Sequence, residues 1–163
     1  MANIIVYTDG SALGNPGPGG YGAILLSGTH RKEISGGFRL TTNNRMELMA
    51  AIAALQEIKG TSHDVEVISD SKYLVDAFND QWTTKWIKRD WKNIKNPDLW
   101  KALIALAEHH RMQWTWIKGH TMHPENERCD FLAKEAASKT ELPEDQGYIA
   151  IKEANIDRTA AAR

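Results

Sequence analysis

Residues 3–27 read NIIVYTDGSALGNPGPGGYGAILLS and contain two strand patterns joined by a glycine- and proline-rich turn. Over Asn3–Thr8 the side chains alternate between the two sides of an extended chain. The glycines and prolines of Gly14–Gly20 then turn the chain, and Tyr21–Ser27 is strand-like again. With a third strand expected over Lys32–Leu40, this stretch predicts an antiparallel meander.

Beyond the meander the chain alternates between helical and extended patterns. N-cap chemistry at 42–44 predicts a helix to about residue 59. Further helices are expected over 73–78, 99–110 and 124–138, and further strands over 65–69 and 113–117. The order βββαβα–α–βα predicts an α/β protein: one mixed sheet with helices on both faces, in a single domain.

Length, cysteine content and the N-terminal sequence do not fit a disulfide-stabilised, secreted or membrane-anchored protein. The chain of 163 residues can bury a core without disulfides or a structural metal. Cys129 is the single cysteine, so no intramolecular disulfide can form. The first ten residues have neither the basic stretch nor the long apolar run of a signal peptide or membrane anchor. We therefore expect a cytoplasmic protein without membrane association.

The net charge of −1 conceals a basic segment. Five cations, which we call the basic stripe, fall within eleven residues: Lys85, Lys88, Arg89, Lys92 and Lys95. Four tryptophans lie in or beside the same segment: Trp82, Trp86, Trp91 and Trp100. The aromatic residues could be core and the lysines a solvated helix face. The interleaving of the two is also typical of a surface that binds phosphates.

Gly17, Gly19 and Gly22 fit the dinucleotide-binding pattern G-x-G-x-x-G. The segment that follows is strand-like, however, so no helix N-terminus is available for a pyrophosphate. Turn geometry is the preferred explanation for these glycines.

Four carboxylates stand where the expected elements end or face the sheet. Asp9 and Asp70 each follow an apolar strand, Glu47 lies on an alanine-rich helix face, and Asp130 borders the apolar stripe of the last expected helix. Each has an ordinary alternative, namely a turn or cap for the aspartates, a helix-start position for Glu47, and solvated surface for Asp130. If they converged, their repulsion would imply bound divalent cations, and oxygen ligands favour Mg²⁺ or Mn²⁺ over zinc.

Two histidines lie in the loop before the last expected helix. His120 follows a glycine and is a candidate proton carrier, because the pKa of a free imidazole is close to neutral. His123 has an ordinary explanation as a neighbour of the helix start. A zinc site that combined both with Cys129 would have the wrong spacing and lack a second cysteine.

Several long motifs resemble bacterial ribonuclease HI: YTDGS (7–11), Gly14–Gly22, TTNNRMELMAA (41–51), SDS (69–71) and WIKGHTMHPENERCD (116–130). The resemblance covers about residues 3–150. It implies the ribonuclease H-like fold with a five-stranded mixed sheet, in a domain over residues 1–150. Residues 151–163 are expected to form an accessory, mobile tail.

The resemblance also implies an activity. Ribonucleases H are endonucleases that cleave the RNA strand of RNA/DNA hybrids and leave a 5′-phosphate and a 3′-hydroxyl. Asp9, Glu47, Asp70 and Asp130 match the family's metal ligands, and His120 matches its loop histidine. The implied cofactor is Mg²⁺, or Mn²⁺, with two ions present when substrate is bound. The implied partner is an RNA/DNA hybrid, and the implied oligomeric state is a monomer.

Further matched positions concern substrate binding. Three asparagines match contacts to the minor groove: Asn15, Asn43 and Asn44. Thr42 and Asn96 match a pocket for a phosphate of the DNA strand. The tryptophan-rich segment corresponds to the family's basic handle, which gives four more candidates: Lys85, Trp86, Lys88 and Arg89.

The chain departs from the family in two places within the matched region. The segment between Trp91 and Trp100 is shorter, and Lys72 stands where family members often have glutamine. Two other functions remain as alternatives. One is a DNA nuclease on the same architecture, and the other is a hybrid-binding module without catalysis.

Overall fold

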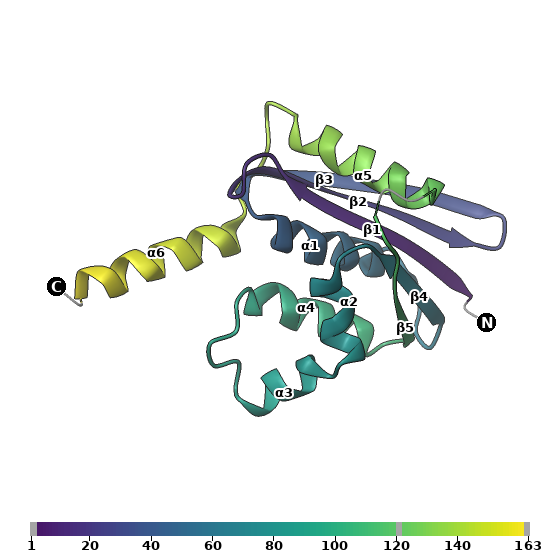
Figure 1. The fold of residues 1–163 in the computed structure, drawn as a ribbon. Helices are drawn as coiled ribbons and strands as arrows, with labels where there is room; N and C mark the ends of the chain where they lie inside the picture. The colour runs from purple at the N-terminus through teal and green to yellow at the C-terminus, as the bar shows by residue number, and fades with distance from the viewer. Residues whose placement is uncertain (1–2, 120–121, 162–163) are drawn as a thin grey trace.

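Five strands form one mixed sheet in the order β3-β2-β1-β4-β5 (Figure 1). This computed structural model describes residues 3–119 and 122–161. The strands are β1 (Ile4–Ala12), β2 (Gly17–Ser27), β3 (His30–Thr41), β4 (Asp64–Ser69) and β5 (Arg111–Trp116). The helices are α1 (Asn43–Gln56), α2 (Lys72–Asn79), α3 (Trp82–Lys88), α4 (Pro97–Ala107), α5 (Pro124–Ala137) and α6 (Gln146–Ala161). Strands β1–β3 pair antiparallel and β4 and β5 run parallel to β1, which confirms the α/β prediction.

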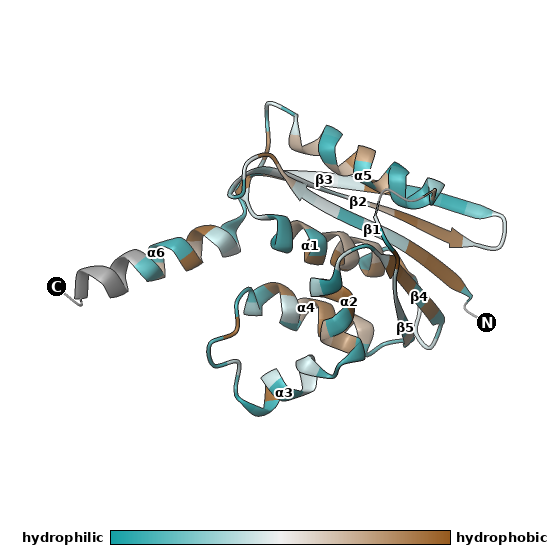
Figure 2. Ribbon diagram, in the orientation of Figure 1, coloured by the Kyte–Doolittle hydropathy of each residue, from teal (hydrophilic) through white to brown (hydrophobic). Residues whose placement is uncertain are grey.

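Helices cover both faces of the sheet (Figure 1). Helix α5 packs on β1, β2 and β3 from one side, and α1 packs on the same strands from the other, with α2 and α4 beside it. Apolar segments lie on parts of β1 and β2 and on α1 and α4, whereas β3 and α3 are mainly pale or teal (Figure 2). No helix in the described part of the chain has the length and apolar character needed to cross a membrane.

The larger core lies on the α1 side of the sheet and is rich in aromatic rings. Trp100 is fully buried, and its Nε1 donates a hydrogen bond to the hydroxyl of Tyr73 at 3.0 Å. The ring of Trp86 contacts that of Trp100 edge-on, with 4.9 Å between centroids. Trp86 and the short helix α3 are therefore attached to the core through aromatic packing.

Three elements differ from the sequence-based expectation. Strand β2 begins at Gly17, inside the segment predicted as a turn, because its glycines pair directly with β1 and β3. Helix α3 was not predicted, and it has no buried residue of its own to create an apolar stripe. Helix α6 occupies the segment predicted as a tail and runs without a break across the expected boundary at residue 150.

The side chain of Arg45 joins three distant parts of the chain. It is 1% exposed, and all five of its N–H groups donate hydrogen bonds, to Asp98 and Asn96 at the start of α4 and to Asp145 before α6. Thr41 also donates to Asp145, at 2.7 Å. Burial alone would raise the pKa of Asp145, but the hydrogen bonds from Arg45 and Thr41 hold it below its usual value.

Replacing Asp145 by Asn should lower the free energy of unfolding by about 3 kcal/mol at neutral pH, because a buried guanidinium loses one anionic partner. The folded-state pKa of Asp145 lies below the unfolded value of 3.8. The carboxylate's stabilisation is thus fully present above that unfolded value and is lost as the pH falls through the folded pKa. Urea unfolding of both proteins should therefore show the difference narrowing at acidic pH.

Asp98→Asn is the matched control, because the side chain of Asp98 is 41% exposed. Its loss should destabilise the protein less than the loss of Asp145 at neutral pH. Equal effects of the two substitutions would mean that burial of Asp145 does not set the strength of this ion pair.

Candidate active site

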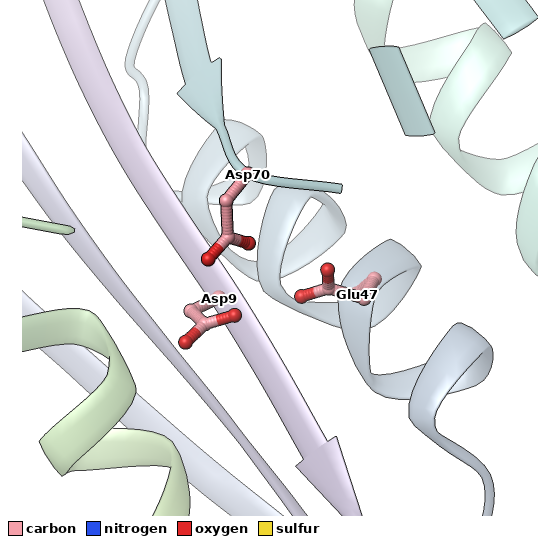
Figure 3. Close-up of side chains that lie close together, drawn as sticks. All are labelled: Asp9, Glu47 and Asp70. Atoms are coloured by element: carbon pink, nitrogen blue, oxygen red, sulfur yellow. The ribbon is translucent and has the colours of Figure 1, made fainter. Parts of the chain in front are cut away.

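Three carboxylates from separate elements point toward one another (Figure 3). Asp9 lies on β1, Glu47 on α1, and Asp70 immediately after β4. One carboxylate oxygen from each lies within 4.8 Å of the other two, and we call this group the carboxylate cluster. These residues are 38 and 23 positions apart in the sequence, so only the tertiary fold brings them together.

Close contact between β1 and α1 places Glu47 beside Asp9. The Cα of Gly10 lies so near α1 that a Cβ there would overlap the backbone of Met46 and Glu47. Only glycine permits this approach. The absence of one side chain therefore brings the helix carrying Glu47 against the strand carrying Asp9.

The end of β4 positions Asp70. The Nε1 of Trp116 donates to the carbonyl oxygen of Asp70 at 3.0 Å, and the amide of Ile117 donates to that of Ser69 at 3.0 Å. Ser71 then caps α2 by accepting from the amide of Leu74. Asp70 is thus held in a short connection between a parallel strand and a capped helix.

The electrostatics of the cluster favour a bound cation. Burial and the nearby Asp70 raise the pKa of Asp9 to about 7. Burial, together with the charges of Asp9 and Asp70, also raises the pKa of Glu47 well above its usual value. The Oε1 atom of Glu47 is buried and accepts no hydrogen bond from the residues that the structure describes. Converging carboxylates with a buried, unpartnered oxygen fit hard divalent cations such as Mg²⁺, which prefer oxygen ligands.

Asp130 lies beside the cluster on α5. Its charge contributes to the raised pKa of Asp9, but it does not belong to the group of three whose oxygens converge. Its carboxylate instead forms an ion pair with Lys134, one turn further along α5, at 2.9 Å. Helix α5 approaches β2 closely at Gly22, where a Cβ would lie 2.6 Å from the carbonyl oxygen of Cys129.

His120, the candidate proton carrier, lies outside the described residues. The residue before it, Gly119, lies against the cluster: a Cβ at this position would lie 2.8 Å from Oδ2 of Asp70. His123 is the N-cap residue of α5 but makes no capping hydrogen bond through its side chain.

Hydrogen bonds connect the β1–β2 turn to the start of α1 through two of the asparagines expected to contact the minor groove. Oδ1 of Asn15 accepts from the amide of Asn43 at 3.1 Å, and Oδ1 of Asn43 accepts from the amide of Ala12 at 2.6 Å. Both side-chain oxygens are therefore occupied, which leaves their NH₂ groups as donors. Asn44 is exposed in the first turn of α1.

Thr42 and Asn96 lie on one cavity, between the start of α1 and the start of α4. The hydroxyl oxygen of Thr42 accepts from the amide of Arg45 as the N-cap of α1, and its hydrogen can still be donated. The side chain of Asn96 bonds to Arg45 and to the hydroxyl of Tyr73, so both of its ends are used within the protein.

Within the tryptophan-rich segment, the basic side chains and the ring of Trp86 differ in their exposure to solvent. Lys85, Lys88 and Arg89 are exposed on and just after α3, whereas the ring of Trp86 is half-buried against Trp100. Direct contact with a polyanion is therefore available to the three cations, while Trp86 holds the helix that presents them.

Two structural features near the site were not anticipated from sequence. The role of Arg45 was missed, although an arginine among the apolar residues of α1 was a visible signal. Lys72 places its ammonium 4.7 Å from the ring centroid of Trp116, a cation–π contact next to Asp70 that residue spacing does not reveal.

Comparison with known proteins identifies the family. The family model for RNase H matches residues 1–138. The chain is 56% identical over 153 residues to a ribonuclease H of Aeromonas salmonicida, covering 91% of this chain and 98% of that protein. It is 52% identical over 150 residues to a ribonuclease H of Syntrophus aciditrophicus, covering 89% of this chain and 86% of that protein.

Solved structures agree with the sequence comparison. LC9-RNase H1, described as a type 1 RNase H with the type 2 active-site motif, matches with a TM-score of 0.75 at 33% identity, over 84% of this chain and 72% of that one. LC11-RNase H1, solved in complex with an RNA/DNA hybrid, matches with a TM-score of 0.62 at 28% identity, over 82% of this chain and 96% of that one. The extent of these matches and the converging carboxylates show that this chain belongs to the ribonuclease H family.

Proposed function

We propose that this protein is an endonuclease that hydrolyses the RNA strand of RNA/DNA hybrids and requires a divalent cation. The observation that carries the proposal is the carboxylate cluster with the buried, unpartnered Oε1 of Glu47. Family membership gives this cluster its reaction class, and the relative solved with a hybrid supports the choice of substrate.

Asp9, Glu47 and Asp70 would hold the metal, and Asp130 stands at the border of their site. We assign Mg²⁺, with Mn²⁺ as a substitute and two ions when substrate is bound. Bound there, the ions would neutralise charge on the scissile phosphate and support in-line attack by water, giving a 5′-phosphate and a 3′-hydroxyl. The protein's own contribution is to hold its acidic groups in place before substrate arrives.

Selection of the RNA strand is assigned to the asparagines at the β1–β2 turn and the start of α1. The side-chain oxygens of Asn15 and Asn43 are held by backbone amides, so both NH₂ groups are pre-oriented donors. Asn44 adds an exposed amide that can both donate and accept. Such groups suit the wide minor groove of a hybrid, where 2′-hydroxyls distinguish RNA from DNA.

We assign binding of the uncut DNA strand to contacts between the protein and the phosphates of that strand. Thr42 offers its hydroxyl hydrogen, and Asn96, whose side chain is bonded within the protein, shapes the pocket at the start of α4. The cations of the basic stripe would bind further phosphates, and Trp86 would support them. His120 remains the proposed proton carrier.

We assign a monomer as the active form, since one chain supplies all three residues of the carboxylate cluster and the cluster needs no residue from a second copy. Hybrids arise where DNA is copied and transcribed, so we place the activity in the bacterial cytoplasm.

The proposal is tested by incubating the protein with a strand-labelled RNA/DNA hybrid and Mg²⁺, beside matched RNA and DNA duplexes. Cleavage of only the RNA strand of the hybrid, abolished by EDTA, is the expected result. Cleavage of the DNA duplex would favour a DNA nuclease on the same fold. Binding of the hybrid without any cleavage under these conditions would favour a non-catalytic binding module.

Asp9→Asn should abolish turnover while hybrid binding survives, because it removes a metal ligand and leaves the groove unchanged. In EDTA at neutral pH the variant should also be more stable than the wild type, since an amide at this position carries no charge for burial and Asp70 to disfavour. Thermal unfolding with and without Mg²⁺ provides a readout independent of activity. Mg²⁺ should raise the midpoint of the wild type and leave that of Asp9→Asn unchanged. Wild-type turnover by this variant would refute the assignment of Asp9.

Replacing Lys85, Lys88 and Arg89 together by Gln should raise KM and leave kcat close to the wild-type value. Each lost phosphate contact should reduce the slope of log affinity against log salt by about 0.9 or less. The control is Lys59→Gln with Lys139→Gln, two exposed lysines outside the basic stripe. An unchanged salt slope in the triple variant would show that these cations face away from the bound hybrid.

A further inference from the structure

The first turn of α6 is fixed to the body of the protein. Asp145, directly before the helix, is 6% exposed, receives two hydrogen bonds from Arg45, and accepts another from the amide of Tyr148. A Cβ at Gly147 would overlap a carboxylate oxygen of Asp98, so the helix passes directly over the Arg45–Asp98 ion pair. The start of α6 therefore has a defined position relative to α1 and α4, and the rest extends away from the sheet (Figure 1).

Helix α6 forms one side of a cavity of about 710 Å³. The opposite side contains Asn15, Thr42 and Asn96, three of the positions assigned to substrate binding. From α6 the lining includes Tyr148, Ile151 and Ala154, which are three residues apart and therefore lie along one face of the helix. The cavity thus joins the groove assigned to the hybrid to a helix in the segment expected to be an accessory tail.

The two sides of this cavity differ in chemistry. The hydroxyl of Thr42 and the NH₂ group of Asn15 lie on one side, and such donors suit a phosphate. The α6 side presents an aromatic ring, an isoleucine and an alanine, with the amide of Asn155 beside them, while Ile94 and Pro97 add apolar surface on the opposite side. A deoxyribose has no 2′-hydroxyl and packs on such a surface without leaving a polar group unpaired, whereas a ribose would lose a hydrogen bond to water.

We infer that α6 forms one wall of the substrate groove, and that its Tyr148–Ile151–Ala154 face contacts the sugar-phosphate backbone of the uncut DNA strand. This inference rests on the proposed function and deepens it by assigning a role in selecting DNA as the uncut strand. The alternative is that α6 covers the cavity and obstructs the hybrid. It predicts that a substitution on this face lowers KM for the hybrid, whereas our inference predicts that it raises KM.

Two alanines of α6 provide a matched test. Ala154 lines the cavity, whereas Ala150 lies on the same helix, outside its lining, and both are exposed. Ala154→Glu should raise KM for the hybrid roughly tenfold at low salt, through repulsion between the new carboxylate and a phosphate. Its kcat should stay unchanged, and the effect should weaken as salt is added. Ala150→Glu places its carboxylate one turn away, outside the lining, and should raise KM less than Ala154→Glu does at each salt concentration.

Equal KM values for the two variants would overturn the inference, and so would a lower KM for Ala154→Glu. If the wild type did not cleave the hybrid at all, the proposed function would fail instead, so the two failures are distinguishable. Far-ultraviolet circular dichroism of both variants should match the wild-type spectrum, which checks that they keep the fold.

A second pair of variants tests the preference for deoxyribose. Affinities for an RNA/DNA hybrid and an RNA/RNA duplex of the same sequence are measured in EDTA. Ile151→Asn supplies a partner for a 2′-hydroxyl and should reduce the preference for the hybrid severalfold, while Ala150→Asn should leave it unchanged. An unaltered preference in Ile151→Asn would refute the contact between α6 and the sugars.

Discussion

Repulsion among the carboxylates of Asp9, Glu47 and Asp70 is the constraint that the surrounding structure must withstand. Burial strengthens this repulsion and raises the pKa values of Asp9 and Glu47. Two features hold the groups together despite it: the close approach of α1 to β1 at Gly10, and the hydrogen-bonded end of β4 at Asp70. Such an arrangement is consistent with a metal site, because a bound divalent cation would offset the repulsion.

Helix α1 links this site to the rest of the molecule. Two positions before Glu47, Arg45 directs its guanidinium away from the carboxylate cluster and toward Asp98 and Asp145. The same helix therefore places Glu47 against β1 and contacts the start of α4 and the segment before α6. A disturbance of the Arg45 ion pairs would consequently affect both the stability of the protein and the shape of the proposed groove.

Acidic and basic side chains occupy separate regions of this nearly neutral protein. The carboxylates gather beside the central strand β1 and the end of β4, while the basic stripe is presented on and after α3, which the ring of Trp86 holds to the core. The overall charge of −1 describes neither region. Since exposed cations are screened by salt and buried carboxylates much less so, substrate binding and metal binding should respond differently to ionic strength.

The sequence by itself determined the α/β class, the antiparallel start of the sheet and the family, because hydrophobic period and turn residues are local properties and the family motifs are long. It also named Asp9, Glu47 and Asp70 as candidates, although each had an ordinary alternative explanation. Only the tertiary structure decided that these three converge while Asp130 pairs with Lys134, because distances between side chains far apart in sequence depend on packing. For the same reason the roles of Arg45 and α6 were not predictable. Their partners belong to other elements, and a local sequence pattern does not show which elements will pack together.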